Sequence, residues 1–310
     1  MSRARARARS LLLVAVAFAA CHHAADDTEP TVKPIPPPPP SATEHMVALL
    51  PDGAQVIVEL DLARLRANAA VGPLATSALA AMGSDSRLPG LPVVVAGSPL
   101  AGADAVVLAA YGVGTAQAAT ITLLATKADV PGGTRVAPDV VAIGPDDWTG
   151  QLATRAALDA QHPLAISDEL RALRKHAEPE GATGAVLRAT ARLSFDARVA
   201  LARITGIEVA PARISVWADI ADDVAVVVDA DAVDPGDQAA KDSAKRLAHT
   251  MRGLFAEVGD DPLVRGLGVA PSLDEARLIM QGTWVRAIVA VGPRHLARVV
   301  ERARAMLTSP

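Results

Sequence analysis

The chain has 310 residues, of which 51% are hydrophobic, 21% charged and 2% aromatic. This length suffices for one large domain or two ordinary ones with a buried core. No uninterrupted apolar stretch reaches the roughly 20 residues that cross a bilayer as a helix, which excludes a polytopic membrane protein. A single cysteine excludes a disulfide scaffold and a multi-thiolate zinc site. The net charge of -4 is unlike that of a basic nucleic-acid binder, so no nucleic acid is expected as a partner.

Residues 1–20 have the pattern of a secretion signal. Arginines alternate with alanines over residues 3–9, which gives a positively charged start without an acidic residue. Residues 11–19 form an apolar segment that is too short to span a membrane stably but has the length of a signal core. Small residues and then the only cysteine, Cys21, follow this segment.

The segment Phe18-Ala19-Ala20-Cys21 resembles the lipobox of bacterial lipoproteins, in which signal peptidase II cuts before the cysteine and the thiol receives a diacylglyceryl group. Phe18 stands where leucine is more usual. The resemblance implies that Cys21 is acylated, and two or more acyl chains hold a protein durably on a bilayer. By the sorting rule of such lipoproteins, His22 in place of aspartate implies the outer membrane, facing the periplasm. The alternative is an ordinary signal peptide that leaves Cys21 as a free thiol.

Residues 21–45 are expected to form a tether between the bilayer and a globular body. The run Pro36 to Pro40 favours polyproline II and resists folding into a core. The histidines and aspartates within residues 22–27 are possible metal ligands, but a segment without fixed geometry favours a solvated linker. A proline run can also dock into an aromatic-lined groove of a partner protein.

Residues 46–161 are expected to form a first unit. Asp61 stands between a strand and a helix, where a capping residue is wanted, and Gly72-Pro73 interrupts the helix that follows. Branched apolar runs and helical spacing of apolar residues predict strands at 55–60, 105–111, 120–126 and 140–143, and helices at 62–78 and 148–158.

Residues 162–310 are expected to form a second unit, with His162-Pro163 at the boundary. Apolar residues alternate with Arg188, Thr190 and Arg192, which predicts a strand with one solvent-facing side. Ser194 is expected to cap the next helix. The pattern predicts strands at 185–193, 214–220, 224–230, 277–281 and 284–291, and helices that include residues 199–204, 240–258 and 296–306, the last one burying Leu296, Val299, Val300, Ala303 and Met306.

Two similar segments indicate an internal duplication. Residues 141–145 and 289–293 both run from a strand through Gly-Pro into a helix, where proline is tolerated in the first turn. Antiparallel hairpins flanked by helices predict an α+β fold of two similar layered units, each with antiparallel sheet packed against helices. In outline the body is similar to duplicated α+β envelope lipoproteins from high-GC bacteria, and no residue in that likeness identifies a chemistry.

Local catalytic motifs are missing from the sequence. Gly112-Val113-Gly114 lacks the third glycine of a dinucleotide-binding loop, and no Gly-Lys pair exists for a P-loop. Gly97-Ser98-Pro99 does not match a nucleophile elbow, and neither H-E-x-x-H nor S-x-x-K occurs. No catalytic residue and no cofactor are therefore predicted, although catalytic residues need not be close in sequence.

An acidic cluster is a candidate metal site. Asp229, Asp231, Asp234 and Asp237 offer the oxygen ligands that calcium prefers, but their spacing departs from that of an EF-hand. Helix capping by Asp234 and interaction of Asp237 with the helix dipole account for more of these residues. Capping is the favoured interpretation, and no metal is predicted.

Arg294, Arg298 and Arg302 follow each other at intervals of four residues on the last helix. They are candidates for contact with lipid headgroups or another anion, and a solvated helix face, partly offset by Glu301, is the alternative. The three tryptophans, Trp148, Trp217 and Trp284, are expected to fill gaps in the core rather than to serve as surface anchors.

The sequence thus predicts a lipid-anchored bacterial envelope protein, more in keeping with a non-catalytic binding or structural module than with an enzyme. Its expected partners are the lipid bilayer, through acylated Cys21, and a further envelope protein. Two alternatives stay open. An exported hydrolase would assemble its site from distant residues, with a His or carboxylate of shifted pKa near a nucleophile. A carrier of an apolar ligand would have a large apolar cavity between sheet and helices.

Overall fold

The computed structural model describes residues 41–81, 100, 102–208, 210–232 and 240–308. The signal segment, Cys21 and the proline run lie outside these residues. The described strands are β1 (Val56–Asp61), β2 (Ala105–Tyr111), β3 (Ala119–Ala125), β4 (Thr134–Ala137), β5 (Val140–Ile143), β6 (Leu187–Arg192), β7 (Arg213–Ile220), β8 (Val224–Asp231), β9 (Arg277–Gln281) and β10 (Trp284–Val291). The described helices are α2 (Ala42–Leu49), α3 (Leu62–Ala67), α4 (Gly72–Ala81), α6 (Asp146–Asp159), α7 (Asp168–His176), α8 (Phe195–Thr205), α9 (Ala240–Gly259), α10 (Pro262–Leu267), α11 (Ala270–Asp274) and α12 (Pro293–Thr308).

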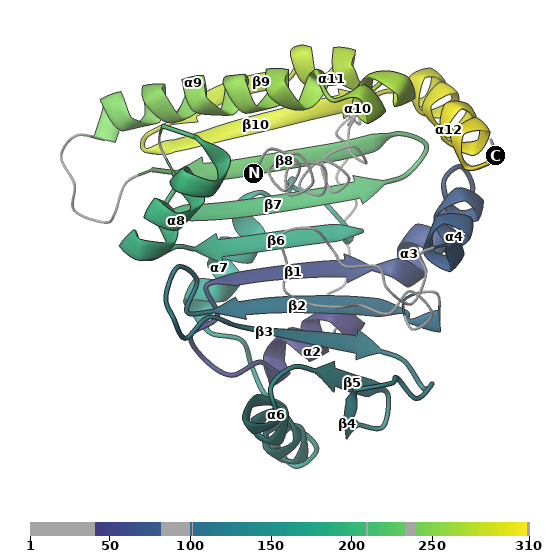
Figure 1. Ribbon diagram of the computed structural model, residues 1–310, viewed down its shortest axis with the longest axis vertical. Helices are drawn as coiled ribbons and strands as arrows, with labels where there is room; N and C mark the ends of the chain where they lie inside the picture. Colours follow the sequence, from purple (N-terminus) through teal and green to yellow (C-terminus); the bar gives the residue numbers. More distant parts are fainter. Residues whose placement is uncertain (1–40, 82–99, 101, 209, 233–239, 309–310) are drawn as a thin grey trace, which may run out of the picture.

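All ten of these strands belong to one antiparallel sheet, in the order β4-β5-β3-β2-β1-β6-β7-β8-β10-β9 (Figure 1). The expected α+β fold class, with antiparallel sheet packed against helices, is confirmed. Read outwards from the centre, β1-β2-β3-β5-β4 and β6-β7-β8-β10-β9 have the same order. One sheet runs through both expected units, because β1 pairs with β6 over residues 56–60 and 187–191.

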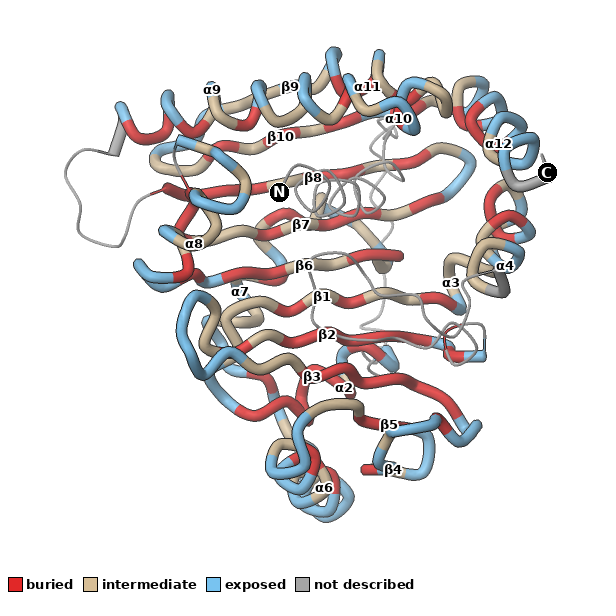
Figure 2. The backbone as a smooth tube through the Cα atoms, in the orientation of Figure 1, coloured by how far each residue is buried: buried red, intermediate tan, exposed pale blue. Residues whose placement is uncertain are grey.

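Side chains alternate between the two faces of this sheet. One face, here the α7 face, carries Ile57 and Glu59 of β1 and packs against α2, α6 and α7. The other, the α9 face, carries Val58 and Leu60 and packs against α3, α4 and α8 to α12. Buried positions therefore follow the strands on both faces, while exposed ones follow the outer sides of the helices (Figure 2). The bulkiest fully buried side chains are Met46, Leu49, Ile121, Leu123, Leu124, Leu152 and Leu247.

Polar side chains set several helix starts. The Asp61 carboxylate accepts a hydrogen bond from the backbone N–H of Arg64 at 2.8 Å, as the sequence predicts. The hydroxyl of Ser194 accepts from the N–H of Ala197 at 3.3 Å and begins α8, also as predicted. Each such cap stabilises its helix by about 1 kcal/mol. Within the described chain, no helix combines the length with the apolar composition that a membrane span requires.

Some expected boundaries differ from the observed ones. Helix α2 begins at Ala42, before the expected start of the body at Met46, because Ser41 accepts a hydrogen bond from Glu44 N–H and caps the helix. Asp146 and Asp147 lie in the first turn of α6 rather than in a loop, where they face the positive end of the helix dipole. Helix α7 and strand β4 were not anticipated, since each is short and has few apolar residues.

Tertiary packing also changes two expected exposures. Thr190 was expected on a solvent-facing side of its strand but is 3% exposed, because α7 covers that part of β6. Met306 was expected in the core but is 43% exposed, since α12 buries only the side that carries Leu296, Val299 and Val300.

Candidate functional site

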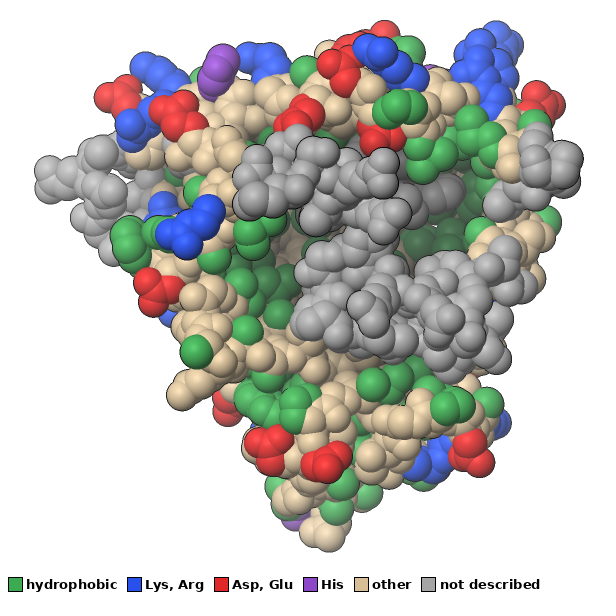
Figure 3. Space-filling view, viewed as in Figure 1, with side chains coloured by type: hydrophobic (Ala, Val, Ile, Leu, Met, Phe, Trp, Pro, Cys, Tyr) green, Lys and Arg blue, Asp and Glu red, His purple; other side chains and the backbone are tan. Residues whose placement is uncertain are grey.

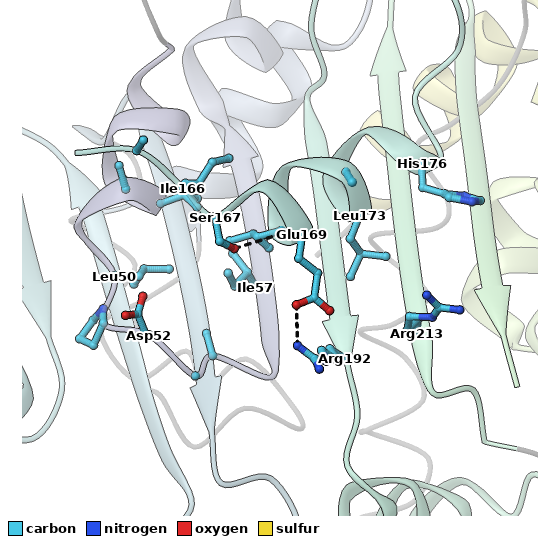
Figure 4. Close-up of a pocket in the computed structure, with 18 of the residues that line it drawn as sticks. Leu50, Asp52, Ile57, Ile166, Ser167, Glu169, Leu173, His176, Arg192 and Arg213 are labelled. Atoms are coloured by element: carbon cyan, nitrogen blue, oxygen red, sulfur yellow. Dashed lines mark hydrogen bonds and ion pairs between the residues drawn. The ribbon is translucent and has the colours of Figure 1, made fainter. Parts of the chain in front are cut away.

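A groove of about 320 Å³ lies on the α7 face, between α7, the end of α2 and the loop that precedes β1 (Figure 4). Its volume is at the lower end of the range that small-molecule sites occupy. Apolar side chains from α2, β1 and α7 make its floor, and charged side chains make its rim. The floor includes Val47, Leu50, Ile57, Ile166, Leu170 and Leu173; the rim includes Asp52, Arg155, Glu169, His176, Arg192 and Arg213.

Helix α7 forms one wall of the groove along its whole length. Its start is capped by Ser167, whose hydroxyl accepts a hydrogen bond from the N–H of Leu170 at 3.3 Å. Acidic residues occupy its first turn and basic residues, ending at His176, its last turn, as the helix dipole favours. Leu173 points from α7 into the groove (Figure 4).

A buried ion pair holds α7 on the sheet. The Nε and Nη2 atoms of Arg174 donate to the two carboxylate oxygens of Glu59, both at 2.7 Å, and the two side chains are 7% and 3% exposed. Burial opposes the charge of Arg174, yet the hydrogen bonds and negative charge of Glu59, with smaller contributions from Glu44 and Glu178, raise the pKa of Arg174 above its ordinary value. The wall of the groove is therefore fixed to β1 by a charged contact.

The far end of the groove is built on Asp229 of β8. Arg286 donates from Nε and Nη2 to the two oxygens of Asp229, at 2.8 and 2.7 Å. The ring Nδ1 of His176 lies 2.7 Å from the same carboxylate. The hydrogen bond to Asp229 raises the pKa of Arg286, against the effect of burial. Because an ionised carboxylate only accepts hydrogen bonds, Nδ1 of His176 is the donor of this contact.

Trp284 contacts the side chains of His176 and Arg213 at this end. Its ring stacks on that of His176, with centroids 3.8 Å apart and planes at 21°. The guanidinium carbon of Arg213 lies 5.0 Å from the Trp284 ring centroid, and Arg213 forms an ion pair with the buried Asp231. Trp284 was expected in the core and instead lines the groove. Of the other two, Trp217 is buried with its N–H on Gly184 O, and Trp148 packs against Tyr111.

This arrangement lacks a nucleophile within reach of His176 among the described groove residues. Ser167, the hydroxyl residue of the lining, lies at the other end of α7, about 13 Å away along the helix. Ser215, on the α7 face beside Asp229, is fully buried and accepts a hydrogen bond from Ala177 N–H at 3.1 Å. The geometry fits binding of a ligand, and among the described groove residues it places no nucleophile beside the His176–Asp229 pair.

Two of the four aspartates of the acidic cluster lie in the described part of the chain. Asp229 and Asp231 are neighbours on one side of β8, and arginines occupy both carboxylates. Asp234 and Asp237 lie outside the described residues. Across the described ranges, no group of three His, Cys, Asp or Glu side chains is arranged to hold a metal ion.

The arginine stripe is far from the groove. Arg294, Arg298 and Arg302 all lie on the exposed side of α12, which packs on the α9 face of the sheet. The sequence pointed to these arginines and to Asp229, but it gave no indication of the groove itself. A signal was present, since Glu59 and Arg286 are charged residues in the middle of otherwise apolar strands.

Comparison with known proteins identifies no family. No protein-family model and no curated protein matches the chain. Among solved structures, crystal form III of TP0453 aligns with a TM-score of 0.43 and 8% sequence identity, covering 82% of this chain and 96% of that one. Crystal form I of TP0453 aligns with a TM-score of 0.41 and 8% identity, covering 83% of this chain and 96% of that one.

Proposed function

We propose that the protein is a lipid-anchored bacterial envelope protein, held on the periplasmic side of the outer membrane, and that its body is a non-catalytic binding module. The sequence Phe18-Ala19-Ala20-Cys21 supports acylation at Cys21, and His22 supports the outer membrane. The observation that carries the binding role is the groove on the α7 face, where an apolar floor meets a rim of ion-paired charges.

The ligand that fits this groove best has an apolar body and a negatively charged group. Leu50, Ile57 and Leu173 offer apolar contact along the floor. On the rim, Arg155 and Arg213 each have a buried Nε–H without a hydrogen-bond acceptor in the described structure. Such unpaired donors cost free energy, which an acceptor-rich ligand can recover if the side chains turn towards it.

A binding role is favoured over hydrolysis because the described groove lining places no nucleophile beside the His176–Asp229 pair. On the rim, Arg192 pairs with Glu169 at 2.8 Å. A carrier of a purely apolar ligand is less well supported, since the groove is small and its rim is charged.

Binding is tested with anilinonaphthalene sulfonate, an apolar fluorescent probe with one negative charge. We expect saturable binding to the folded protein, weakened at least about tenfold, or ~1.4 kcal/mol, by Ala172→Trp, which places a large ring at the groove mouth from an exposed position. Ala157→Trp is the matched control, because Ala157 is an exposed helix residue that does not line the groove. Equal binding by the two variants, or no saturable binding to the unmodified chain, would exclude the groove.

The rim charge is tested separately. Arg192→Glu should weaken binding of the sulfonate probe while changing little the binding of phenylnaphthylamine, which lacks the sulfonate. Arg203→Glu on α8 makes the same change at an exposed position away from the groove and should leave both probes unaffected. Loss of both probes in Arg192→Glu would show that the groove recognises no anion.

The anchor has its own test. Cys21→Ser should move the protein out of the membrane fraction of the cells, because no acyl chain can then be attached. Protein of mature size that stays with the membranes in this variant would contradict the proposed anchor and leave the groove results untouched.

A further inference from the structure

Helix α12 carries three exposed arginines on one side, and the guanidinium of Arg302 also lies against Gly268 at the end of α10. Residues four apart on a helix lie on the same side, so Arg294, Arg298 and Arg302 form a stripe about 12 Å long. The opposite side of the helix is buried in the core, which holds the stripe in place. Figure 3 shows Lys or Arg side chains at the upper right of the molecule, where α12 lies in Figure 1, and others along the same upper edge.

These arginines have no carboxylate partner within the described part of the chain. Some other surface arginines are paired, as Arg265 is with Asp260. Glu301 is the acidic residue on this side of α12 and offsets one of the three charges. The stripe therefore stands out as a cationic strip on a chain whose net charge is negative.

Two large apolar side chains lie beside the stripe. Leu263 of α10 is 47% exposed and Met306 of α12 is 43% exposed. The two helices touch at Gly266, where an added Cβ would come within 2.6 Å of the Met306 methyl group. Leu263 lies three residues before Gly266 on the same side of α10. Arginines and exposed apolar residues thus form one surface, here the α10/α12 surface.

We propose that the α10/α12 surface, made of Leu263, Arg294, Arg298, Arg302 and Met306, rests against the anionic headgroups of the bilayer that carries the acylated Cys21. The arginines face the phosphates and the two apolar side chains enter the boundary between headgroups and acyl chains. The nineteen residues between Cys21 and Ser41 let these two residues lie up to about 70 Å apart, which is long enough to let this side of the body turn to the membrane.

This contact gives the body a defined orientation on the membrane, which the tether alone does not give. An anchored body is already at high effective concentration near its membrane, so a weak surface contact is enough to orient it. With α12 on the headgroups, the groove, which lies on the opposite face of the sheet, is turned away from the bilayer and towards the periplasm. This orientation rests on the proposed anchoring, whereas the affinity of the surface for lipid does not.

The test uses the processed chain, residues 21–310, with Cys21→Ser, so that no acyl chain contributes. Its sedimentation is measured with vesicles of phosphatidylglycerol and phosphatidylcholine in equal parts, and with vesicles of phosphatidylcholine alone. We expect binding to the anionic vesicles only, and a loss of about 100-fold in partitioning for the triple variant R294Q/R298Q/R302Q, at about fivefold for each arginine.

The triple variant R203Q/R252Q/R277Q is the matched control, because it removes the same charge from three exposed positions outside the α10/α12 surface. It should bind the anionic vesicles within about twofold of the parent chain. Equal losses in the two triple variants, equal binding to both kinds of vesicle, or no binding by the parent chain would overturn the proposal. A failure here leaves cell fractionation of Cys21→Ser unchanged, so the surface and the anchor are judged apart.

Discussion

Glu59 and Arg174 come from different halves of the chain and form a two-pronged ion pair that is almost fully buried. Glu59 lies in the central strand β1, and Arg174 lies in the helix that walls the groove. The pair therefore fixes the wall of the groove to β1, the strand that pairs with β6 where the two halves of the chain meet.

Removing one partner of this ion pair should lower the free energy of unfolding. Glu59→Ala leaves Arg174 buried without its main partner, and we expect a loss of about 3–5 kcal/mol in the free energy of unfolding. Replacing both residues, as in Glu59→Leu with Arg174→Met, should recover most of it, because no buried charge is then left alone. Urea unfolding of the three proteins measures both effects. The exposed pair Glu169–Arg192 is the control, and Glu169→Ala should cost less than about 1 kcal/mol.

The only tyrosine of the chain reports on alkaline unfolding. Burial, with a smaller contribution from Asp52, raises the pKa of Tyr111 although Arg155 acts in the other direction, and its hydroxyl donates to Pro51 O at 3.0 Å. A pKa that is higher in the folded than in the unfolded state gives stability that is present below the ordinary value of about 10 and is lost as the pH rises through the folded value.

We therefore expect tyrosinate absorbance to appear only as the protein unfolds above pH ~10. Tyr111→Phe should lower stability at neutral pH by about 1 kcal/mol and make its decline above pH ~10 less steep. Tyrosinate absorbance at pH ~10 in protein with an unchanged circular dichroism spectrum would count against this account.

The glycine at position 114 is explained by its backbone conformation and a close contact, with no need for a bound nucleotide. Its φ is +84°, and an added Cβ would come within 2.8 Å of the backbone oxygen of Asp196, at the start of α8. Gly114→Ala should cost roughly 2–4 kcal/mol, from a left-handed backbone and a contact that only a backbone shift relieves. Gly53→Ala is the control, because Gly53 has φ +92° but open space around it, and it should cost only about 1–2 kcal/mol. Similar thermal unfolding of the two variants would contradict the close contact.

Calcium should not stabilise the protein through β8. Asp229 and Asp231 have their oxygens on arginine nitrogens, and an incoming cation would have to break buried ion pairs to reach them. We expect the same Tm with excess calcium and with a chelator. A calcium-dependent rise in Tm that Asp229→Asn abolishes would restore the metal interpretation of this cluster.

Local patterns in the sequence determined most of the individual elements. The strands at residues 55–60, 214–220 and 224–230 were predictable because each depends on neighbours within a few residues. Asp61 and Ser194 were predictable as caps for the same reason, since a cap needs only the next turn of the helix. The α+β class followed from the order of these elements.

Only the tertiary structure decided which elements meet. The pairing of β1 with β6 joins residues more than a hundred positions apart, and no local pattern specifies it. The role of a charged residue in an apolar strand, such as Glu59 or Arg286, can be assigned only when its partner is known. A buried charge destabilises the fold when it is alone and is tolerated when it is paired. The groove has the same origin, since Ile57, Leu173 and Trp284 become neighbours through long-range packing that periodicity does not encode.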